Sequence, residues 1–335
     1  MTMNTQATPN HWPPCRHGET FDIGGDKSVQ LMKEEFVQGL WSGKPLPKAL
    51  LYALSPHLWK EVSQEATYYQ THEELAILKR HCDEIVPLFS AGMTIIDIGA
   101  GQVHPHDQQA LVTAGLKCTY IAIDISCSSM AQSISALAKE FDASLVYILG
   151  LHGTFEDGMK YCISIPGPRL FLSLGSTICN KPYPEAVKDL QGWSKELGQE
   201  DALLFGQDAH TLDDIEKIER AYHGPAFVAF IESIRTIAYQ LTGKEVFDQD
   251  KWELTCSFST GRSLCHKFEL RAKQKNCFGY VYEAGMKVDC FASYKHDQQR
   301  VKDMCKEAGL RVQQSWDNGS EMCMCLSHAT SSVRY

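Results

Sequence analysis

The sequence predicts an α/β protein with a doubly wound parallel sheet at its core and a smaller α+β lobe inserted into it. Between residues 94 and 208, apolar strand-like stretches alternate with amphipathic segments, as in a parallel sheet with crossover helices. After residue 252, stretches of alternating polar and apolar residues follow one another across short turns. This second pattern is typical of antiparallel strands.

The first part of the chain is predicted to be helical. Residues 1–27 lack periodicity and are expected to form a loosely ordered tail. Residues 31–43 have helical spacing and end in glycine, and a second short helix is expected behind Pro45 and Pro47. A longer helix is predicted over about 73–88, where apolar residues recur at helical spacing.

The central and last parts of the chain supply the two sheets. Parallel strands are predicted at 94–98, 118–124, 144–149, 169–174 and 202–208, with helices near 108–114, 127–141 and 183–197. Residues 211–243 have helical spacing, and antiparallel strands are predicted at 252–259, 265–273, 276–284 and 287–296. A last helix, 297–308, precedes two strands that flank an Asp317-Asn318-Gly319 turn.

The composition is that of an ordinary globular protein. The chain has 335 residues, of which 44% are hydrophobic and 10% aromatic, enough to bury a full core. We find no apolar run of about 18 residues to span a bilayer and no signal-peptide segment at the start, so we expect a cytoplasmic protein without a membrane partner. The 13 cysteines include no C-x-x-C pair and are expected to be mostly reduced core residues.

The charge excludes one class of partner. The formal net charge is −9, and the chain has no basic cluster with which to bind phosphates. We therefore expect no nucleic-acid partner and favour a small molecule as the substrate.

A glycine-containing loop is the first candidate for ligand binding. The stretch TIIDIGAGQVHPHD, 94–107, runs from an apolar strand into Gly99 and Gly101, where missing side chains let backbone amides approach a ligand. Asp124 ends the next predicted strand and can accept hydrogen bonds from ribose hydroxyls. Both NAD and S-adenosylmethionine would suit an acid at that position.

The residues after the two glycines separate these ligands. The third glycine of a dinucleotide fingerprint is missing, and His104 stands in its place. This favours S-adenosylmethionine, which carries no phosphate, over NAD, whose pyrophosphate needs that close approach. We expect no metal here, because His104 and His106 do not share a helix face and no further ligands stand nearby.

Five further motifs occur in a fixed order. They are TYYQTHEELAILK (67–79), LHGTFEDG (151–158), LGSTICN (174–180), ERAY (219–222) and FASYKH (291–296). Together they resemble the histidine-specific α-N-methyltransferase family, which comprises the ergothioneine-pathway histidine methyltransferases and the fungal dimethylallyltryptophan N-methyltransferases. The resemblance extends over about 34–328.

The resemblance implies an S-adenosylmethionine-dependent N-methyltransferase with a Rossmann-like core and an inserted α+β substrate lobe. It implies a core of residues 73–209 plus 296–330, a substrate lobe of 28–72 plus 210–295, and a tail of 1–27. The final antiparallel hairpin agrees with this layout. We expect a monomer in the cytoplasm that acts on a small molecule, an amino acid, within secondary metabolism such as alkaloid biosynthesis.

The resemblance also implies the residues of the site. Tyr52 and Asn180 are expected to act in catalysis, Asn180 on the α-amino and carboxylate groups and Tyr52 by orienting the amine. The expected substrate contacts are Tyr68, Tyr222, Phe230, Phe268, Phe291 and Ser293. The expected cofactor contacts are Gly99, Gly101, His106, Asp124, Thr154, Phe155 and Gly175. Each of these residues also has a purely structural interpretation, such as an N-cap role for Asn180 or core packing for Tyr222.

The chain departs from the family pattern at two places. Family members carry a lysine just after the glycine loop, where this chain has His104, Pro105 and His106, and His106 is the expected replacement. Histidine-methylating members bind the imidazole with a glutamate, where this chain has Phe291 two residues before Ser293. An imidazole without a hydrogen-bond partner beside phenylalanine would make the binding free energy less favourable by about 1–3 kcal/mol.

These aromatic residues predict the kind of substrate. Phe268 is expected to add a second aromatic wall beside Phe291, together with Tyr68 and Phe230. We therefore predict a tryptophan-like or prenylated amino acid that is methylated on its α-amino group.

Four alternatives remain open at this point. The first alternative is that the substrate is histidine. The second is that the chain is an inactive protein that binds S-adenosylmethionine as a partner of another enzyme. The stretch NKPY, 180–183, partly resembles the N-P-P-Y motif of methyltransferases that act on planar amines. The glycine loop by itself also fits an NAD-dependent oxidoreductase.

Overall fold

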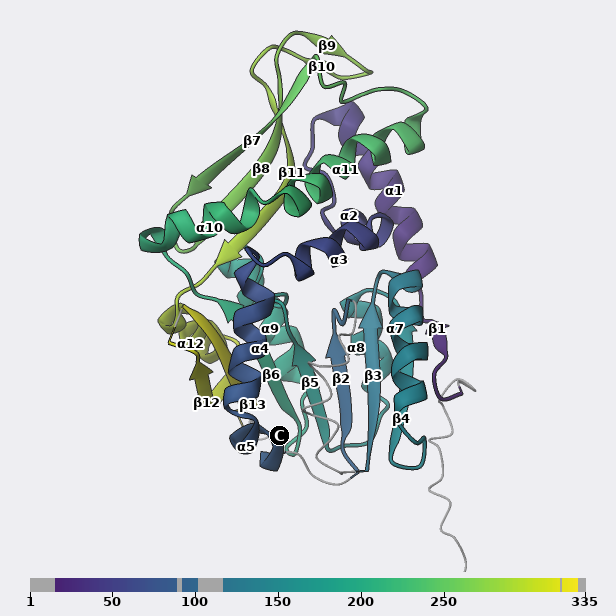
Figure 1. The fold of residues 1–335 in the computed structure, drawn as a ribbon, viewed down its shortest axis with the longest axis vertical. Helices are drawn as coiled ribbons and strands as arrows, with labels where there is room; N and C mark the ends of the chain where they lie inside the picture. Colours follow the sequence, from purple (N-terminus) through teal and green to yellow (C-terminus); the bar gives the residue numbers. More distant parts are fainter. Residues whose placement is uncertain (1–15, 89–91, 102–116, 320, 331–335) are drawn as a thin grey trace, which may run out of the picture.

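The structure is a computed structural model that describes residues 16–88, 92–101, 117–319 and 321–330. Figure 1 shows two parts, a lower one built on a large sheet and an upper one built on a small sheet and helices. The large sheet has eight strands in the order β1-β4-β3-β2-β5-β6-β13-β12. Its strands are β1 (Thr20–Asp22), β2 (Thr94–Ile98), β3 (Cys118–Asp124), β4 (Val146–His152), β5 (Arg169–Ser173), β6 (Ala202–Asp208), β12 (Leu310–Asp317) and β13 (Met322–Ala329).

The large sheet is parallel except at one edge. Strands β1 to β6 pair in parallel, and β13 inserts antiparallel between β6 and β12. Every residue of β2, β5 and β6 is buried, because helices cover both faces of these central strands. The predicted doubly wound α/β core is therefore confirmed, including its closing antiparallel hairpin.

Helices cover the two faces of this sheet separately (Figure 1). One layer contains α4 (Tyr69–Arg80), α5 (Cys82–Ile85), the 3-10 turn η1 (Val86–Leu88) and α7 (Cys127–Glu140); the other contains α8 (Phe155–Cys162), α9 (Tyr183–Glu196) and α12 (Gln298–Glu307). Because successive side chains of a strand point to opposite faces, Ile95 of β2 belongs to one buried cluster and Ile96 to the other.

The upper part combines helices with antiparallel strands (Figure 1). Its helices are α1 (Gly25–Ser42), α2 (Ala49–Leu54), α3 (Pro56–Gln64), the 3-10 turn η2 (Leu212–Asp214), α10 (Ile215–Tyr222) and α11 (Pro225–Thr242). Its strands are β7 (Trp252–Ser259), β8 (Leu264–Ala272), β9 (Asn276–Cys277), β10 (Val281–Tyr282) and β11 (Lys287–Lys295). The sheet order is β11-β8-β7, with β9 and β10 as a separate ribbon.

Three sequence predictions need correction. Residues 16–27 were expected in a loose tail, but β1 pairs with β4, and Gly18 donates its N–H to the Ile148 carbonyl at 2.8 Å. The predicted strand 276–284 folds back on itself, because Gly279 has a φ of 94°, a conformation that glycine adopts without strain. The predicted helix 211–243 breaks before Pro225, which begins α11.

One other helix prediction differs from the structure. The helix predicted over 73–88 stops at Arg80, and α5 and η1 follow as short separate turns. Residues 1–15 and the helix predicted near 108–114 lie outside the described residues. No helix of the described segments is long and apolar enough to cross a membrane.

One close approach of α4 to the sheet explains a glycine in β6. A Cβ on Gly206 would overlap the side-chain carboxylate of Glu74 on α4. The same carboxylate accepts the backbone N–H of Gly175 at 2.7 Å, so it cannot move without releasing that residue. The absence of a side chain at Gly206 therefore keeps α4 seated on the sheet.

We predict that Gly206→Ala lowers the free energy of unfolding by about 1–3 kcal/mol, because the added methyl group displaces a buried side chain. The measurement is urea unfolding at equilibrium. The control is Gly192→Ala in α9, where the nearest atom to the new Cβ is 3.7 Å away. Gly192→Ala is expected to raise the free energy of unfolding by about 0.5–1 kcal/mol, because alanine favours a helix more than glycine does. Equal midpoints for Gly206→Ala and wild type would contradict the prediction.

Candidate active site

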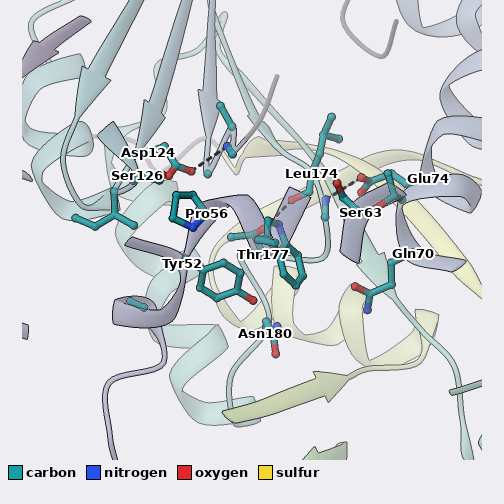
Figure 2. A pocket seen from close by; sticks show the side chains of 18 of the residues that line it. Tyr52, Pro56, Ser63, Gln70, Glu74, Asp124, Ser126, Leu174, Thr177 and Asn180 are labelled. Atoms are coloured by element: carbon teal, nitrogen blue, oxygen red, sulfur yellow. Dashed lines mark hydrogen bonds between the residues drawn. The ribbon is translucent and has the colours of Figure 1, made fainter. Parts of the chain in front are cut away.

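A cavity of about 420 Å³ is lined both by residues of the large sheet and its loops and by residues of the upper part. Its floor is formed by residues that follow β2, β3 and β5, at the point where strand order reverses between β2 and β5. Such a reversal is where open α/β sheets bind their ligands. In Figure 2, Asp124 and Ser126 lie on one side of this cavity, while Tyr52, Gln70 and Asn180 lie around the other.

The Asp124 side of the cavity is held by backbone hydrogen bonds. Gly101 donates its N–H to Asp124 Oδ2 at 2.9 Å, and Ser126 donates its N–H to Oδ1 at 2.7 Å. Burial raises the pKa of the Asp124 carboxyl, and these two hydrogen bonds oppose the rise. Each oxygen of the Asp124 carboxylate keeps a further lone pair, so both oxygens can still accept hydrogen bonds from hydroxyl groups of a ligand.

Small and polar residues beside Asp124 fit a nucleoside-like ligand. Gly99 has a φ of 75°, and a Cβ there would come within 3.2 Å of the Phe155 ring. Ser126 and Ser129 line the cavity with buried hydroxyls that have no hydrogen-bond partner among the described residues. Buried hydroxyls are normally paired, so these two groups suit a ligand that carries several polar atoms.

A strained turn shapes the middle of the cavity. Gly175 and Ser176 both have positive φ, 71° and 56°, and Ser176 is the one non-glycine residue of the described segments with this conformation. Ser176 Oγ accepts the N–H of Asp208 at 2.9 Å, and Thr177 Oγ1 donates to the Leu174 carbonyl at 2.7 Å. Such strain persists only where neighbouring groups hold it. The turn thereby brings Gly175 and Thr177 to the cavity wall.

The structure brings most of the predicted site residues to this one cavity. Those that line it are Gly99, Gly101, Asp124, Phe155 and Gly175 on one side and Tyr52, Tyr68, Asn180, Tyr222, Phe291 and Ser293 on the other. His106 lies outside the described residues. Thr154 does not line the cavity, because its hydroxyl caps α8 through mutual hydrogen bonds with Asp157.

Two predicted substrate contacts lie behind the wall. Phe230 and Phe268 are buried and do not line the cavity. Phe230 packs against Tyr52 with 5.2 Å between ring centroids, and Phe268 packs against Phe227 at 5.3 Å. The prediction that they form the cavity surface is not supported, and both support the aromatic wall from behind.

The aromatic part of the wall also contains a residue that sequence analysis missed. Trp59 on α3 lines the cavity, and its ring packs against Tyr52 at 4.9 Å and Tyr68 at 5.7 Å between centroids. No motif marks Trp59, and helical spacing alone does not distinguish it from a core residue. With Phe291, these three rings give the cavity one apolar, aromatic side.

The orientation of the Asn180 amide follows from its neighbour. The backbone N–H of Tyr294 on β11 donates to Asn180 Oδ1 at 2.8 Å. Since a backbone N–H only donates, the atom that it contacts is the amide oxygen. The amide NH₂ group is then the part of Asn180 that faces a ligand, and it can donate to a carboxylate.

A fully buried ion pair stands behind Tyr222. Lys295 Nζ of β11 lies 2.6 Å from Asp208 Oδ2 at the end of β6. Tyr69 Oη and Gln70 Nε2 donate to the same oxygen at 2.7 and 2.6 Å. Burial alone would raise the pKa of Asp208, but Lys295 and His210 hold it well below its usual range. The carboxyl is therefore ionised at neutral pH.

The ion pair positions two residues of the cavity wall. Lys295 Nζ donates to Tyr222 Oη at 3.1 Å and to Ser293 Oγ at 3.3 Å. Tyr222 Oη and Ser293 Oγ are also hydrogen-bonded to each other at 2.7 Å, and Gln70 Nε2 donates to Tyr222 Oη at 2.9 Å. Burial lowers the pKa of Lys295, but Asp208 and then Tyr222 raise it above its ordinary value.

A second lysine lines the cavity beside Phe291. Lys48 Nζ donates to the backbone carbonyls of Asn180 at 3.1 Å and Ala292 at 3.2 Å, and lies 5.6 Å from the Phe291 ring centroid. Burial, and then the positive charge of Lys181, lower the pKa of Lys48 from 10.5 to about 8. Sequence analysis missed this residue, because a lysine at a helix start looks like an exposed one.

Tyr52 is a hydrogen-bond donor at neutral pH. Burial, followed by the nearby Tyr222 and Asp124, raises the pKa of its phenol above the ordinary value. The protonated phenol lines the cavity, with its hydroxyl directed inward in Figure 2. This group can orient an acceptor or a water molecule, and it is not a base.

Comparison with known proteins decides the family. Residues 32–329 match the sequence model of the family described as histidine-specific methyltransferase, SAM-dependent, where SAM is S-adenosylmethionine. The chain belongs to this family. The predicted resemblance is thereby confirmed, as are an enzyme of the S-adenosylmethionine-dependent N-methyltransferase class and S-adenosylmethionine as its cofactor.

The similar proteins include two fungal relatives of this methyltransferase. It is 29% identical over 325 residues to 4-dimethylallyltryptophan N-methyltransferase easF of Trichophyton verrucosum, over 89% of this chain and 93% of that protein. It is 26% identical to Ergothioneine biosynthesis protein 1 of Neurospora crassa, over 83% of this chain but 32% of that protein. An S-adenosylmethionine-dependent methyltransferase of Clostridium acetobutylicum aligns with a TM-score of 0.40 at 10% identity, over 79% of this chain and 92% of that one.

We predict that Lys295→Met lowers the free energy of unfolding by about 3–5 kcal/mol, because it leaves the Asp208 charge buried without its partner. Urea unfolding monitored by circular dichroism measures this loss. The matched control is Lys267→Met, which removes a partly exposed ion pair with Asp289 and is expected to cost at most about 1 kcal/mol. A Lys295→Met loss no larger than that of the control would contradict the prediction.

We also predict a pH-dependent contribution from Lys48. The folded chain releases the Lys48 proton near pH 8, whereas the ordinary value is 10.5, so the unfolded chain binds more protons between these limits. The stability of wild type relative to Lys48→Met is therefore expected to rise by about 1–3 kcal/mol from about pH 7.5 to 10. Urea unfolding at several pH values measures this difference. The control is Lys44→Met at an exposed position, and a constant difference would contradict the prediction.

Proposed function

We propose that this methyltransferase methylates the α-amino group of an aromatic, tryptophan-like amino acid, including prenylated ones. The observation that carries the proposal is the aromatic side of the cavity, which is lined by Tyr52, Trp59, Tyr68 and Phe291, with 6.3 Å between the ring centroids of Phe291 and Tyr52. An apolar wall favours an apolar side chain, whereas an imidazole there would lack a hydrogen-bond partner. The relative from Trichophyton verrucosum, which is named for 4-dimethylallyltryptophan, supports the same class.

We propose a division of the two parts that follows the predicted domains. The core, 73–209 plus 296–330, binds S-adenosylmethionine through Gly99, Gly101, Asp124, Phe155 and Gly175. The lobe, 28–72 plus 210–295, together with Asn180, binds the amino acid. The arrangement of these residues on opposite sides of one cavity supports this division.

The reaction needs placement more than acid–base chemistry. Bound S-adenosylmethionine supplies an electrophilic methyl group on a sulfonium. The neutral α-amine would take this methyl group on its lone pair as the C–S bond breaks, with the C–S electrons returning to sulfur and an amine proton passing to solvent. Holding the three reacting atoms in line accounts for much of the acceleration, and a water-poor cavity favours a step that disperses charge.

The residues on the cavity wall can supply this placement. The Asn180 NH₂ group donates to the substrate carboxylate, and the Tyr222 hydroxyl does so when its proton turns away from Ser293 Oγ, which lies 2.7 Å from Tyr222 Oη. The protonated Tyr52 phenol orients the amine, either by accepting an amine N–H on its oxygen or through a water molecule. The fixed position of Tyr222, which accepts hydrogen bonds from Gln70 and Lys295, supports its role. With the carboxylate held and the amine oriented in this way, the lone pair of the neutral amine is directed toward the methyl group.

We further propose a monomer that acts in the cytoplasm within secondary metabolism. The 12 cysteines of the described residues are free, and most of them are buried, which suits a reducing compartment. Sedimentation of the purified protein tests the monomer, and fluorescence microscopy of a tagged chain tests the compartment.

The test of the function is mass spectrometry after incubation with S-adenosylmethionine and a mixture of tryptophan, dimethylallyltryptophan, tyrosine and histidine. We expect mass gains of one or more methyl groups on a tryptophan-like compound and formation of S-adenosylhomocysteine. Methylation of histidine alone would contradict the proposal, and so would binding of the cofactor without any turnover.

We predict that Phe291→Glu lowers kcat/KM for the tryptophan-like substrate by about tenfold or more, because it places a carboxylate on the apolar wall. The ratio of histidine to tryptophan-like turnover is expected to rise. Affinity for S-adenosylmethionine, measured by calorimetry, is expected to stay within about twofold. The control is Phe21→Glu on the exposed edge strand β1, and unchanged selectivity of Phe291→Glu would contradict the prediction.

A further inference from the structure

Three potential metal ligands meet where the end of α10 packs against β7 and β8 of the small sheet. His223 ends α10, Cys256 lies on β7 and His266 lies on β8. In the β7–β8 pairing, Cys256 lies opposite Phe268 and Phe258 opposite His266, so Cys256 and His266 are diagonal neighbours on one face. The ligand atoms of all three residues lie within 4.8 Å of one another, and His223 Nε2 is 3.1 Å from Cys256 Sγ.

His266 is a buried polar group without a partner. Its side chain is fully buried, and neither ring nitrogen has a hydrogen-bond partner among the described residues. Phe258 stacks on one face of the ring with 4.1 Å between centroids, and Phe268 lies 4.5 Å away. Because buried polar atoms are nearly always paired, an imidazole in this state needs an explanation.

A bound ion provides that explanation. We propose that His223, Cys256 and His266 bind one Zn²⁺ ion, with the fourth position open to water. Zinc takes thiolate sulfur at about 2.3 Å and imidazole nitrogen at about 2.0–2.1 Å in a tetrahedron, which separates ligand atoms by roughly 3.3–3.6 Å. The present separations, 3.1 Å between His223 Nε2 and Cys256 Sγ and at most 4.8 Å for the others, lie near this geometry. The exposed His223 and Cys256 give the ion access from solvent.

The ligand types select the metal. One thiolate and two imidazoles favour Zn²⁺ over Mg²⁺ or Ca²⁺, which prefer oxygen ligands. A second group, Asp22, Asp26 and His152, is also close together but differs in one respect. His152 Nδ1 already lies 3.3 Å from Asp22, and its Nε2 lies 3.0 Å from the Ile125 carbonyl. Because both nitrogens of the His152 ring already have partners, an ion is not needed to explain its burial.

The proposed zinc site adjoins the active site without being part of it. His223 directly follows Tyr222, and the His266 ring lies edge-on to the Tyr222 ring at 5.2 Å between centroids. An ion held there would join the end of α10 to the β7–β8 hairpin behind the cavity wall. Zinc is thus expected to stabilise the lobe around Tyr222, whichever amino acid the enzyme methylates.

The test is a zinc titration of the reduced, metal-free protein in competition with a chromophoric chelator. We expect one equivalent of zinc to bind with a Kd below about 1 µM and to raise Tm by about 2 °C or more. His223→Gln and Cys256→Ser, both at exposed positions, are expected to weaken this binding at least tenfold and to abolish the Tm shift. Cobalt in place of zinc is expected to give a thiolate charge-transfer absorption that Cys256→Ser removes.

Two control variants keep the result specific. Cys277→Ser removes another exposed thiol, and Asp26→Asn removes a carboxylate of the second group. Both are expected to bind zinc like wild type. Binding weaker than about 10 µM, or binding that His223→Gln and Cys256→Ser retain unchanged, would overturn the proposal, and methyl transfer to any amino acid has no bearing on this outcome.

Discussion

The Lys295–Asp208 ion pair is the interaction on which the rest of the site depends. Lys295 is contributed by β11 of the upper part and Asp208 by β6 of the large sheet, and neither is exposed. The two segments are also joined through the backbone, because His296, which follows Lys295, donates its N–H to the Asp208 carbonyl at 3.1 Å. A buried charge pair is tolerated only when further hydrogen bonds satisfy it. Those bonds reach α4 through Tyr69 and Gln70.

The same network explains how a sheet and a lobe make one cavity. The large sheet places the loops that line the cavity at the strand-order reversal, with Asp124 after β3 and Gly175 after β5, on either side of β2. The lobe contributes Tyr222 and Ser293, which are fixed by the ion pair and not by the loops. The two sides of the cavity are thus positioned by different sets of forces. Backbone geometry sets the first, and buried electrostatics sets the second.

Sequence analysis predicted most of the core, because its strands are continuous apolar runs that periodicity detects. It missed β1, a three-residue edge strand that is too short to show alternation. Ordered motifs led to Asn180, Tyr222 and Phe291, since each lies within a stretch characteristic of the family. Distances across the fold cannot be read from such motifs.

The cavity-wall residues that sequence analysis misplaced or missed share one physical cause, because their positions depend on tertiary packing. Phe230 and Phe268 lie on amphipathic elements, and their patterns look alike whether a ring faces a ligand or another ring. Trp59 and Lys48 reach the cavity only because α2 and α3 cross above the sheet, which is a tertiary arrangement. The buried charges Asp208 and Lys295 also lack a local pattern, because each becomes meaningful only when paired with the other.

The position of Lys48 has a consequence for how such an enzyme changes its preference for amino acids. Its ammonium group is hydrogen-bonded at once to the loop after β5, through Asn180, and to β11, through Ala292. Three stretches of chain, widely separated in sequence, are thus tied together at the end of the cavity next to Phe291. Because both acceptors are backbone carbonyls, the side chains at Asn180 and Ala292 can be exchanged without loss of this junction, whereas a loop that follows a different path would break it.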